Sequence, residues 1–224
     1  MIAQGFVSNG AKVYLSSRDA AACQSAAEEL TRHAASLSPP SPGTAHALPA
    51  DLQDLASCKE LLASLQKLES KLHVLVNNAG AAWGDSIDTY PDAAWNKLLT
   101  LNLQRAFTVT QLALPLLEAA GTAQDPARII NIGSVDGLRV PAASSFAYSA
   151  SKAGLHHLSR HLARDLGPRN VTSNTLACGP FDTKMMAVPL RSFREAIEEA
   201  VPRGRIGTPE DVAGACLFLA SRAG

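Results

Sequence analysis

Several features that would place a chain outside the ordinary globular class are missing from this sequence. No stretch approaches the roughly 18 apolar residues that suggest a membrane-spanning helix, and the opening MIAQGFVSNGAKVYL lacks the basic start and apolar run of a signal peptide. The 20 basic residues balance 20 acidic ones, so no net field recruits nucleic acid or an anionic membrane. We therefore expect no nucleic-acid partner, no membrane partner and a cytoplasmic location.

Cysteine is scarce, and no metal-binding motif is present. The 4 cysteines are far apart and form no CxxC pair, which argues against both a disulfide framework and a zinc cluster. His157 and His161 have the i, i+4 spacing of a helical zinc pair, but no glutamate follows His157, so the HExxH pattern is not met. We expect His156, His157 and His161 to share an exposed or interfacial helix face, and no metal site.

What the sequence does contain is a regular alternation of two kinds of segment. Short β-rich runs occur at 11–17, 44–52, 72–80, 127–134 and 171–179. Between and after them lie helix-length stretches at 19–36, 53–70, 92–120, 148–166 and 208–222. This order predicts an α/β fold in which helices cover both faces of one parallel sheet, as a single domain over 1–224. Ligands of such sheets bind beyond the carboxyl ends of the strands.

Tyr148 and Lys152 are the first candidates for chemistry, because their i, i+4 spacing puts both side chains on one helix face. A neighbouring ammonium stabilises a phenolate and so favours acid/base use of a tyrosine near neutral pH. Ser134 closes the strand RIINIGS and could offer its hydroxyl beside the phenol. The alternatives are the polar start of an amphipathic helix and a turn serine after a strand.

Four motifs in register carry a family resemblance over nearly the whole chain. VLVNNAG, the serine in IINIGSVDG, YSASKAG and GRIGTPEDVAGACLFLAS resemble the short-chain dehydrogenase/reductase family. The pattern is most similar to its ketoacyl-reductase branch. The resemblance implies a Rossmann-like doubly wound sheet and an NADP(H)-dependent oxidoreductase that reduces a carbonyl, such as a 3-oxoacyl group or a similar ketone, to an alcohol.

The resemblance also implies roles for the catalytic candidates. Tyr148 matches the acid/base, Lys152 the residue that lowers its pKa and holds the nicotinamide ribose, and Ser134 the residue that orients the carbonyl. Asn102, in LLTLNLQRAF, matches the asparagine that anchors a proton-relay water. Its alternative is a helix asparagine that bonds the backbone.

Cofactor contacts are implied at the ends of several strands. Ser17 and Arg18 follow the first β-rich run, where a cation favours a 2′-phosphate and hence NADP(H) over NAD(H). In the turn after the last strand, Cys178 stands where the family usually has proline. The remaining positions that match are Asp51 and Leu52 beside the adenine, Asn77, Asn78, Ala79 and Gly80 near the adenosine ribose, and Gly179, Pro180 and Thr183 near the nicotinamide.

The two ends of the sequence differ from the family pattern. The family opens with a strand and a glycine-rich turn, whereas MIAQGFVSNGAK resembles the later turns of the first helix, and a further strand is expected after FLASRAG. We therefore expect a domain truncated at both ends. A homodimer or homotetramer is implied if the chain is complete. The alternative function is a catalytically impaired family member that acts at most as an interaction or oligomerisation module.

Overall fold

The computed structural model describes residues 1–224, and its strands lie where the β-rich runs predicted them. The strands are β1 (Lys12–Leu15), β2 (Thr44–Ala47), β3 (Val74–Asn77), β4 (Ala127–Ile132) and β5 (Val171–Leu176). The helices are α1 (Ile2–Ser8), α2 (Ala20–Ser36), α3 (Leu55–Leu68), α4 (Asp92–Leu99), α5 (Arg105–Ala120), α6 (Phe146–Leu166), α7 (Ala187–Glu199) and α8 (Pro209–Ala220).

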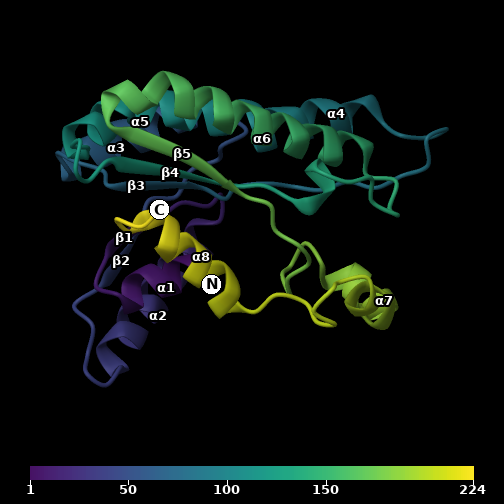
Figure 1. Ribbon diagram of the computed structural model, residues 1–224, viewed down its shortest axis with the longest axis horizontal. Coiled ribbons are helices and arrows are strands. Elements are labelled where there is room, and N and C mark those ends of the chain that lie inside the picture. The colour runs from purple at the N-terminus through teal and green to yellow at the C-terminus, as the bar shows by residue number, and fades with distance from the viewer.

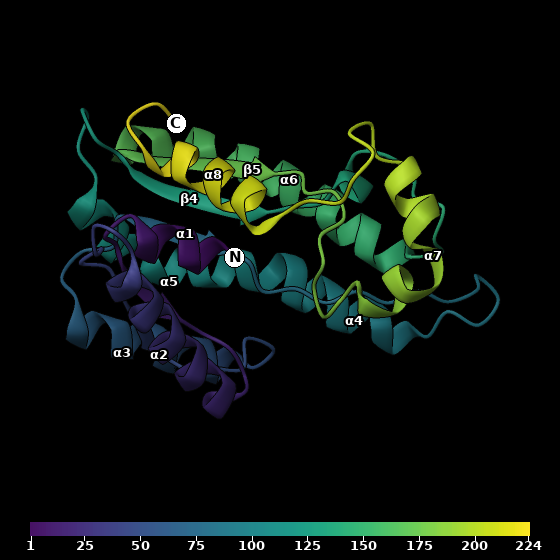
Figure 2. The same ribbon diagram turned by 90° about the horizontal axis from the view of Figure 1, so that it is seen from below.

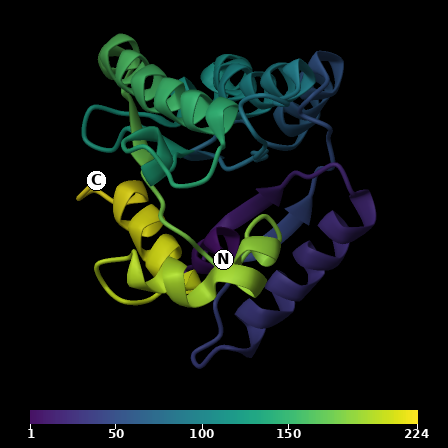
Figure 3. The same cartoon turned by 90° about the vertical axis from the view of Figure 1, so that its right-hand side faces the viewer.

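The strands form two parallel sheets, so the prediction of one sheet is wrong. β1 pairs only with β2, while β3, β4 and β5 form a separate sheet in that order. β1 and β3 are both edge strands, and no strand of this chain joins them. In Figure 3 the larger sheet and its helices form one half of the molecule, and the β1–β2 sheet lies in the other half with α1, α2 and α8. The Rossmann-like α/β character is nevertheless kept, because every strand pair is parallel.

β4 is the most buried strand and joins two apolar clusters. Ile129 and Ile130 are both fully buried, and their side chains point to opposite faces of the sheet because side chains alternate along a strand. Ile129 packs in a cluster with residues of α3, α5 and α6, whereas Ile130 packs against α8. In Figure 1, α5 and α6 lie on one side of this sheet and α1 and α8 on the other.

The helix predictions are confirmed with two additions. The stretch 92–120 is divided by a π-helical turn, Thr100–Gln104, between α4 and α5. α7 was not predicted. α1 confirms that the opening residues are helical, and it lies beside α8 in Figure 2. The two helices approach closely at Gly5, where a Cβ atom would lie 2.6 Å from that of Ala213.

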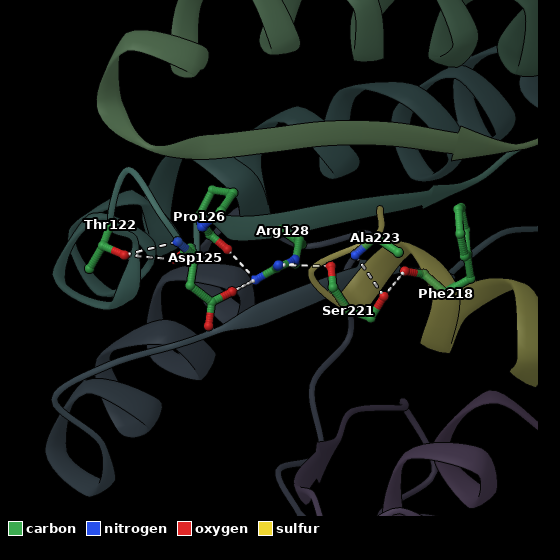
Figure 4. Close-up of polar contacts among 7 residues, drawn as sticks. All are labelled: Thr122, Asp125, Pro126, Arg128, Phe218, Ser221 and Ala223. Atoms are coloured by element: carbon green, nitrogen blue, oxygen red, sulfur yellow. Dashed lines mark hydrogen bonds and ion pairs between the residues drawn. The ribbon is translucent and has the colours of Figure 1, made fainter.

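Arg128 at the start of β4 fastens the carboxyl end of α8 to the larger sheet (Figure 4). Its side chain is 5% exposed, and its Nη2 atom donates a 2.8 Å hydrogen bond to the backbone oxygen of Ser221. Its Nη1 atom donates to the Asp125 carboxylate at 2.6 Å and also to the backbone oxygen of Pro126. A buried guanidinium is thus paired and hydrogen-bonded at the end of the sheet that lies away from the predicted site.

Candidate active site

Ser134 lies just beyond the carboxyl end of β4, where the strand turns toward α6. It is 6% exposed, and its Oγ atom accepts a 3.1 Å hydrogen bond from the backbone N–H of Asp136 at the start of a short turn, Val135–Gly137. That turn rests on α6 because Gly137 lacks a side chain, and a Cβ there would lie 2.8 Å from the backbone nitrogen of Ala153. The strand end and the helix are therefore held in direct contact.

Tyr148 and Lys152 lie one turn apart on α6, as the spacing predicted. The Lys152 ammonium is 5.7 Å from the centroid of the Tyr148 ring. Lys152 is only 5% exposed, and its Nζ atom donates a 2.7 Å hydrogen bond to the backbone oxygen of Ile132. Burial lowers the pKa of Lys152 from 10.5 to about 8, against a smaller opposing effect of Cys178. No carboxylate pairs with this ammonium, so it is a buried cation directed at the site.

Burial also governs the Tyr148 phenol. It raises the pKa of Tyr148 above its ordinary value, and Asp136 and Cys178 act in the same direction, while the neighbouring Ser134 hydroxyl lowers the pKa. The net shift is therefore opposite to the lowering by Lys152 that the resemblance implies. A neutral phenol at physiological pH is a proton donor, the form that reduction of a carbonyl requires.

Asn102 lies in the π-helical turn and joins the same group. It is 1% exposed, and its amide nitrogen donates to the backbone oxygen of Ala81 at 2.9 Å and to the Ser151 hydroxyl at 3.0 Å. Its amide oxygen accepts from the backbone N–H of Ala81 at 2.9 Å. Both side-chain donors are therefore used, and Asn102 fixes the loop that follows β3. A Cβ on Gly80 would lie 3.3 Å from Asn102 Oδ1 and 3.7 Å from Lys152 Nζ, so this loop lies against the lysine.

Four of the residues predicted near the adenosine follow the strands of the smaller sheet and are more exposed than the Tyr148 group. Ser17 and Arg18 follow β1 and are both exposed, with the Ser17 hydroxyl bonded to the Asp19 backbone at 3.1 Å. Asp51 is exposed, and its carboxylate accepts from the backbone N–H of Gln53. The Leu52 carbonyl accepts a 2.9 Å hydrogen bond from Arg105 Nε, which links this loop to α5. These four residues lie apart from the Tyr148 group, on the smaller sheet.

Asn77 is directed into the protein rather than toward a ligand. Its amide donates to the Thr110 hydroxyl at 3.1 Å and to Asn131 Oδ1 at 2.9 Å, both in the interior. Asn78 and Ala79 are exposed on the loop beyond β3. The last group of predicted contacts follows β5: Gly179 and Thr183 are exposed, and the Pro180 carbonyl accepts from the backbone N–H of Gly207 at 2.8 Å.

The histidine prediction is corrected at one position. His157 and His161 are exposed, but His156 is 8% exposed, and its Nε2 atom accepts a 3.2 Å hydrogen bond from the Ser134 backbone N–H. The prediction that all three histidines share one helix face is wrong, because a helix turns about 100° per residue and neighbouring residues such as His156 and His157 point in different directions. The signal was available: His156 is four residues after Lys152, on the face that also carries Tyr148.

The structure contains neither a metal-binding cluster nor a membrane-spanning helix. No group of three or more His, Cys, Asp or Glu side chains is arranged to hold a metal ion. None of the helices combines the length and apolar character that crossing a membrane requires.

Comparison with known proteins agrees with the geometry. All of residues 1–224 match the family model described as enoyl-(acyl carrier protein) reductase. A rhamnolipids biosynthesis 3-oxoacyl-[acyl-carrier-protein] reductase of Pseudomonas aeruginosa is 39% identical over 226 residues, which cover 100% of this chain and 85% of that protein. A galactitol 2-dehydrogenase (L-tagatose-forming) of Cereibacter sphaeroides is 33% identical, covering 99% of this chain and 83% of the relative.

A solved structure shares the arrangement of the elements. The Pseudomonas aeruginosa RhlG/NADP active-site complex superimposes with a TM-score of 0.89 at 38% sequence identity, over 98% of this chain and 83% of that one.

Proposed function

The chain belongs to the short-chain dehydrogenase/reductase family, and from that premise we propose that it is an NADP(H)-dependent oxidoreductase that reduces a carbonyl to an alcohol. The observation that carries the proposal is the Tyr148 phenol beside the buried, unpaired Lys152 ammonium, with Ser134 at the adjoining strand end. A cation buried without a carboxylate partner costs free energy, so its presence here indicates a functional role. The same three groups are those that the sequence motifs favoured.

The residues present fit the two ends of a nicotinamide dinucleotide. Lys152 supplies a buried ammonium that can donate a hydrogen bond to a ribose hydroxyl, and Gly80 leaves room beside it. Arg18 is an exposed guanidinium at the end of β1 that forms no ion pair with a carboxylate of this chain, which suits a 2′-phosphate. We propose that the nicotinamide end is held by Tyr148, Lys152, Gly179, Pro180 and Thr183, and the adenosine end by Ser17, Arg18, Asp51, Leu52, Asn78, Ala79 and Gly80.

The chemistry of the chain's own residues follows from this placement. The cofactor supplies the hydride when it is bound. Ser134 donates a hydrogen bond to the substrate carbonyl oxygen, and the Tyr148 phenol gives its proton to the same oxygen as negative charge develops there. The Lys152 ammonium stabilises the phenolate that remains. Asn102 does not touch the reacting atoms in this scheme and acts by holding Ala81 and Ser151 in place.

For the substrate we propose a 3-oxoacyl thioester or a similar ketone. The support is the 39% identity to a 3-oxoacyl-[acyl-carrier-protein] reductase over the whole chain. α7 stands beyond the carboxyl end of β5 in Figure 1 and exposes Val188 and Phe193, which are 72% and 64% exposed. Apolar side chains at this position suit an acyl chain better than a polyol. Polyol oxidation, the reaction named for the galactitol 2-dehydrogenase, is the alternative that the assay should include.

The test is an assay of NADPH consumption with a 3-oxoacyl thioester, an unfunctionalised ketone and a keto sugar, with NADH in parallel. We expect the highest kcat/KM for the thioester with NADPH. Tyr148→Phe should lower kcat by roughly 10²- to 10⁴-fold, because the proton donor is lost, while Tyr14→Phe on the other sheet should match the wild type. A Tyr148→Phe variant that keeps most of its activity would remove the proton-donor assignment.

The remaining expectations concern partners and location. We propose a homodimer or homotetramer, supported by an open groove of about 430 Å³ beside α5 and α6 that Leu103, Phe107 and Leu158 line together with Gln104, Gly154, His157 and His161. We also propose a cytoplasmic protein with a small-molecule substrate and without a nucleic-acid or membrane partner, and a single domain over 1–224. The match to reductases along the whole chain favours an enzyme over the alternative of an interaction module.

A further inference from the structure

We propose that His156 is a positioning residue: its neutral imidazole holds the backbone N–H of Ser134 and so fixes the serine hydroxyl against Tyr148. The inference rests on the proposed function, because it concerns how the proposed carbonyl-orienting residue is held. His156 does not touch substrate in this scheme. It acts through Ser134.

The contact is direct and buried. His156 Nε2 lies 3.2 Å from the Ser134 backbone nitrogen, and the side chains of both residues are more than nine-tenths buried. Ser134 lies two residues after the end of β4. Its backbone N–H donates to a side chain of α6 rather than to a neighbouring strand. Because Ser134 is buried, this donor would lack a protein partner if the imidazole were absent.

Gly133 makes the contact possible. A Cβ at residue 133 would lie 2.1 Å from His156 Nε2 and 2.7 Å from its Cδ2 atom. These distances are too short for any side chain at this position while the imidazole keeps its place. It would also lie 2.7 Å from Cγ2 of Thr175 on the neighbouring strand. The imidazole therefore occupies the space that the missing side chain leaves, between the end of β4 and α6.

Two side chains of α6 hold the strand end on both sides of Gly133. Lys152 donates to the carbonyl of Ile132 at 2.7 Å, and His156 accepts from the N–H of Ser134 at 3.2 Å. Tyr148, Lys152 and His156 are spaced four residues apart, so one helix face carries the proposed proton donor and both anchors. The distance between the phenol and the serine hydroxyl is then set by α6 itself.

The protonation state of the imidazole follows from the bond it makes. Nε2 can accept only while it is unprotonated, so the bond requires neutral His156 with its hydrogen on Nδ1. Burial lowers the pKa of His156, and the nearby Lys152 and Arg160 cations lower it further. The surroundings therefore favour the accepting form.

The experiment compares three point variants of the full chain with the wild type. His156→Leu removes the acceptor and keeps an apolar side chain, His156→Gln returns an acceptor oxygen at a similar reach, and Gly133→Ala displaces the ring without changing it. The control is His73→Leu, an exposed histidine before β3 at the opposite end of the same sheet. Hydrogen exchange of the Ser134 amide and the ¹⁵N shift of His156 Nε2 are measured by NMR without cofactor, and kcat and the Kd for NADPH are measured separately.

We expect His156→Leu and Gly133→Ala to lower kcat by roughly 10- to 100-fold, since small displacements of an orienting group have effects of this order. The Kd for NADPH should change less than about 3-fold. Exchange of the Ser134 amide should accelerate in both variants, and His156→Gln should recover at least half of the lost rate on a logarithmic scale. His73→Leu should match the wild type in every measurement.

Three results overturn the proposal. They are an unchanged Ser134 exchange rate in His156→Leu, a wild-type Nε2 shift typical of a protonated nitrogen, and a kcat in His156→Leu equal to that of wild type. The NMR readouts separate this failure from failure of the proposed function: if the wild type reduces no carbonyl, the proposed function fails first, and Ser134 exchange still reports whether the bond exists.

Discussion

The two halves of the molecule carry different parts of the proposed site and differ in how deeply their strand residues are buried. In the three-stranded half, five of the six β4 residues are buried, and Asn131 donates to the hydroxyls of Ser159 and Ser173 in the interior. In the two-stranded half, none of the four β1 residues is buried, and three of the candidate contacts at its strand ends, Ser17, Arg18 and Asp51, are exposed. The proposed acid/base group therefore lies on the better-packed half.

The difference in burial matches a difference between the two proposed tasks, which are proton transfer in the three-stranded half and phosphate binding in the two-stranded half. Proton transfer depends on placement to within a fraction of an ångström, so its groups benefit from a rigid, buried setting. A guanidinium that binds a phosphate can act from an exposed, mobile side chain because the attraction extends over several ångströms. The structure of each half matches the tolerance of the step proposed for it.

A large effect on kcat is expected in the three-stranded half, at Ser134. Ser134→Ala should lower kcat by about 10²- to 10³-fold, the usual result of removing one donor to a developing oxyanion. The Kd for NADPH should stay near the wild-type value, because the hydroxyl faces the substrate. Stopped-flow reduction assays and fluorescence titration measure the two quantities. A variant that loses cofactor binding and keeps kcat would place Ser134 in the wrong role.

In the three-stranded half, the buried Lys152 ammonium should lower the free energy of unfolding, a cost that accompanies its proposed function. Its pKa is about 8 in the folded protein against an ordinary 10.5, so between these values the unfolded chain binds a proton that the folded chain has released. Stability therefore rises with pH across this window, and the penalty is fully present below it. Near pH ~7, removing the buried charge in Lys152→Met should raise the free energy of unfolding by up to about 3 kcal/mol. Loss of the hydrogen bond to Ile132 should offset about 1 kcal/mol of that gain.

That advantage of Lys152→Met should shrink as the pH approaches 10.5, which chemical denaturation at neutral and alkaline pH can follow. The variant should be inactive at every pH. An advantage independent of pH would mean that the folded and unfolded states bind the Lys152 proton equally well.

Matched substitutions should measure the packing difference directly. Asn131→Leu removes the amide that bonds Asn77, Ser159, Ser173 and the backbone oxygen of Asn174. It should destabilise the chain by about 2–3 kcal/mol, because buried polar groups lose their partners. Thr31→Val removes the α2 hydroxyl that accepts from the backbone N–H of Ala45 on β2 at 2.9 Å and should destabilise it by about 1 kcal/mol. Urea unfolding gives both values. Equal losses would contradict the contrast between the halves.

The smallest effect on catalysis is expected in the two-stranded half, at Arg18, where only the affinity for NADPH should change. Arg18→Ala should raise the Kd for NADPH by roughly 10-fold, or about 1.4 kcal/mol, and leave the Kd for NADH nearly unchanged. Neither kcat nor the melting temperature should move, because the guanidinium is exposed and does not touch the proposed acid/base group. Arg32→Ala on α2 serves as the control for a general loss of positive charge.

Local patterns predicted most of the elements, and long-range pairing was the part they could not supply. The alternation of β-rich and helical runs placed all five strands within a few residues of their observed positions. The split into two sheets depends on which strand edges meet, which no local pattern records. α7 was missed although its residues 187–199 have a helical period, because Pro189 lies inside it and the helical geometry breaks at Phe193.

The proposed site shows the same division. Tyr148, Lys152, Ser134 and Asn102 were found because a motif names them, and the structure brings them together. His156 was assigned to the exposed face, since its role depends on a space left by Gly133, 23 positions earlier in the chain. Asn77 was assigned to a ligand, but it bonds Thr110 and Asn131, partners that only the packing of α5 on the sheet reveals.

The bond from Arg128 to the Ser221 carbonyl has a consequence for the order of folding. The two residues are 93 positions apart, so the bond closes a long loop that contains α6, β5 and α7. Closing a long loop requires chain entropy to be lost before any contact compensates for it. We expect α8 to join the sheet late, after β4 and β5 have paired, so the carboxyl end of the chain should be the last part to gain protection during refolding.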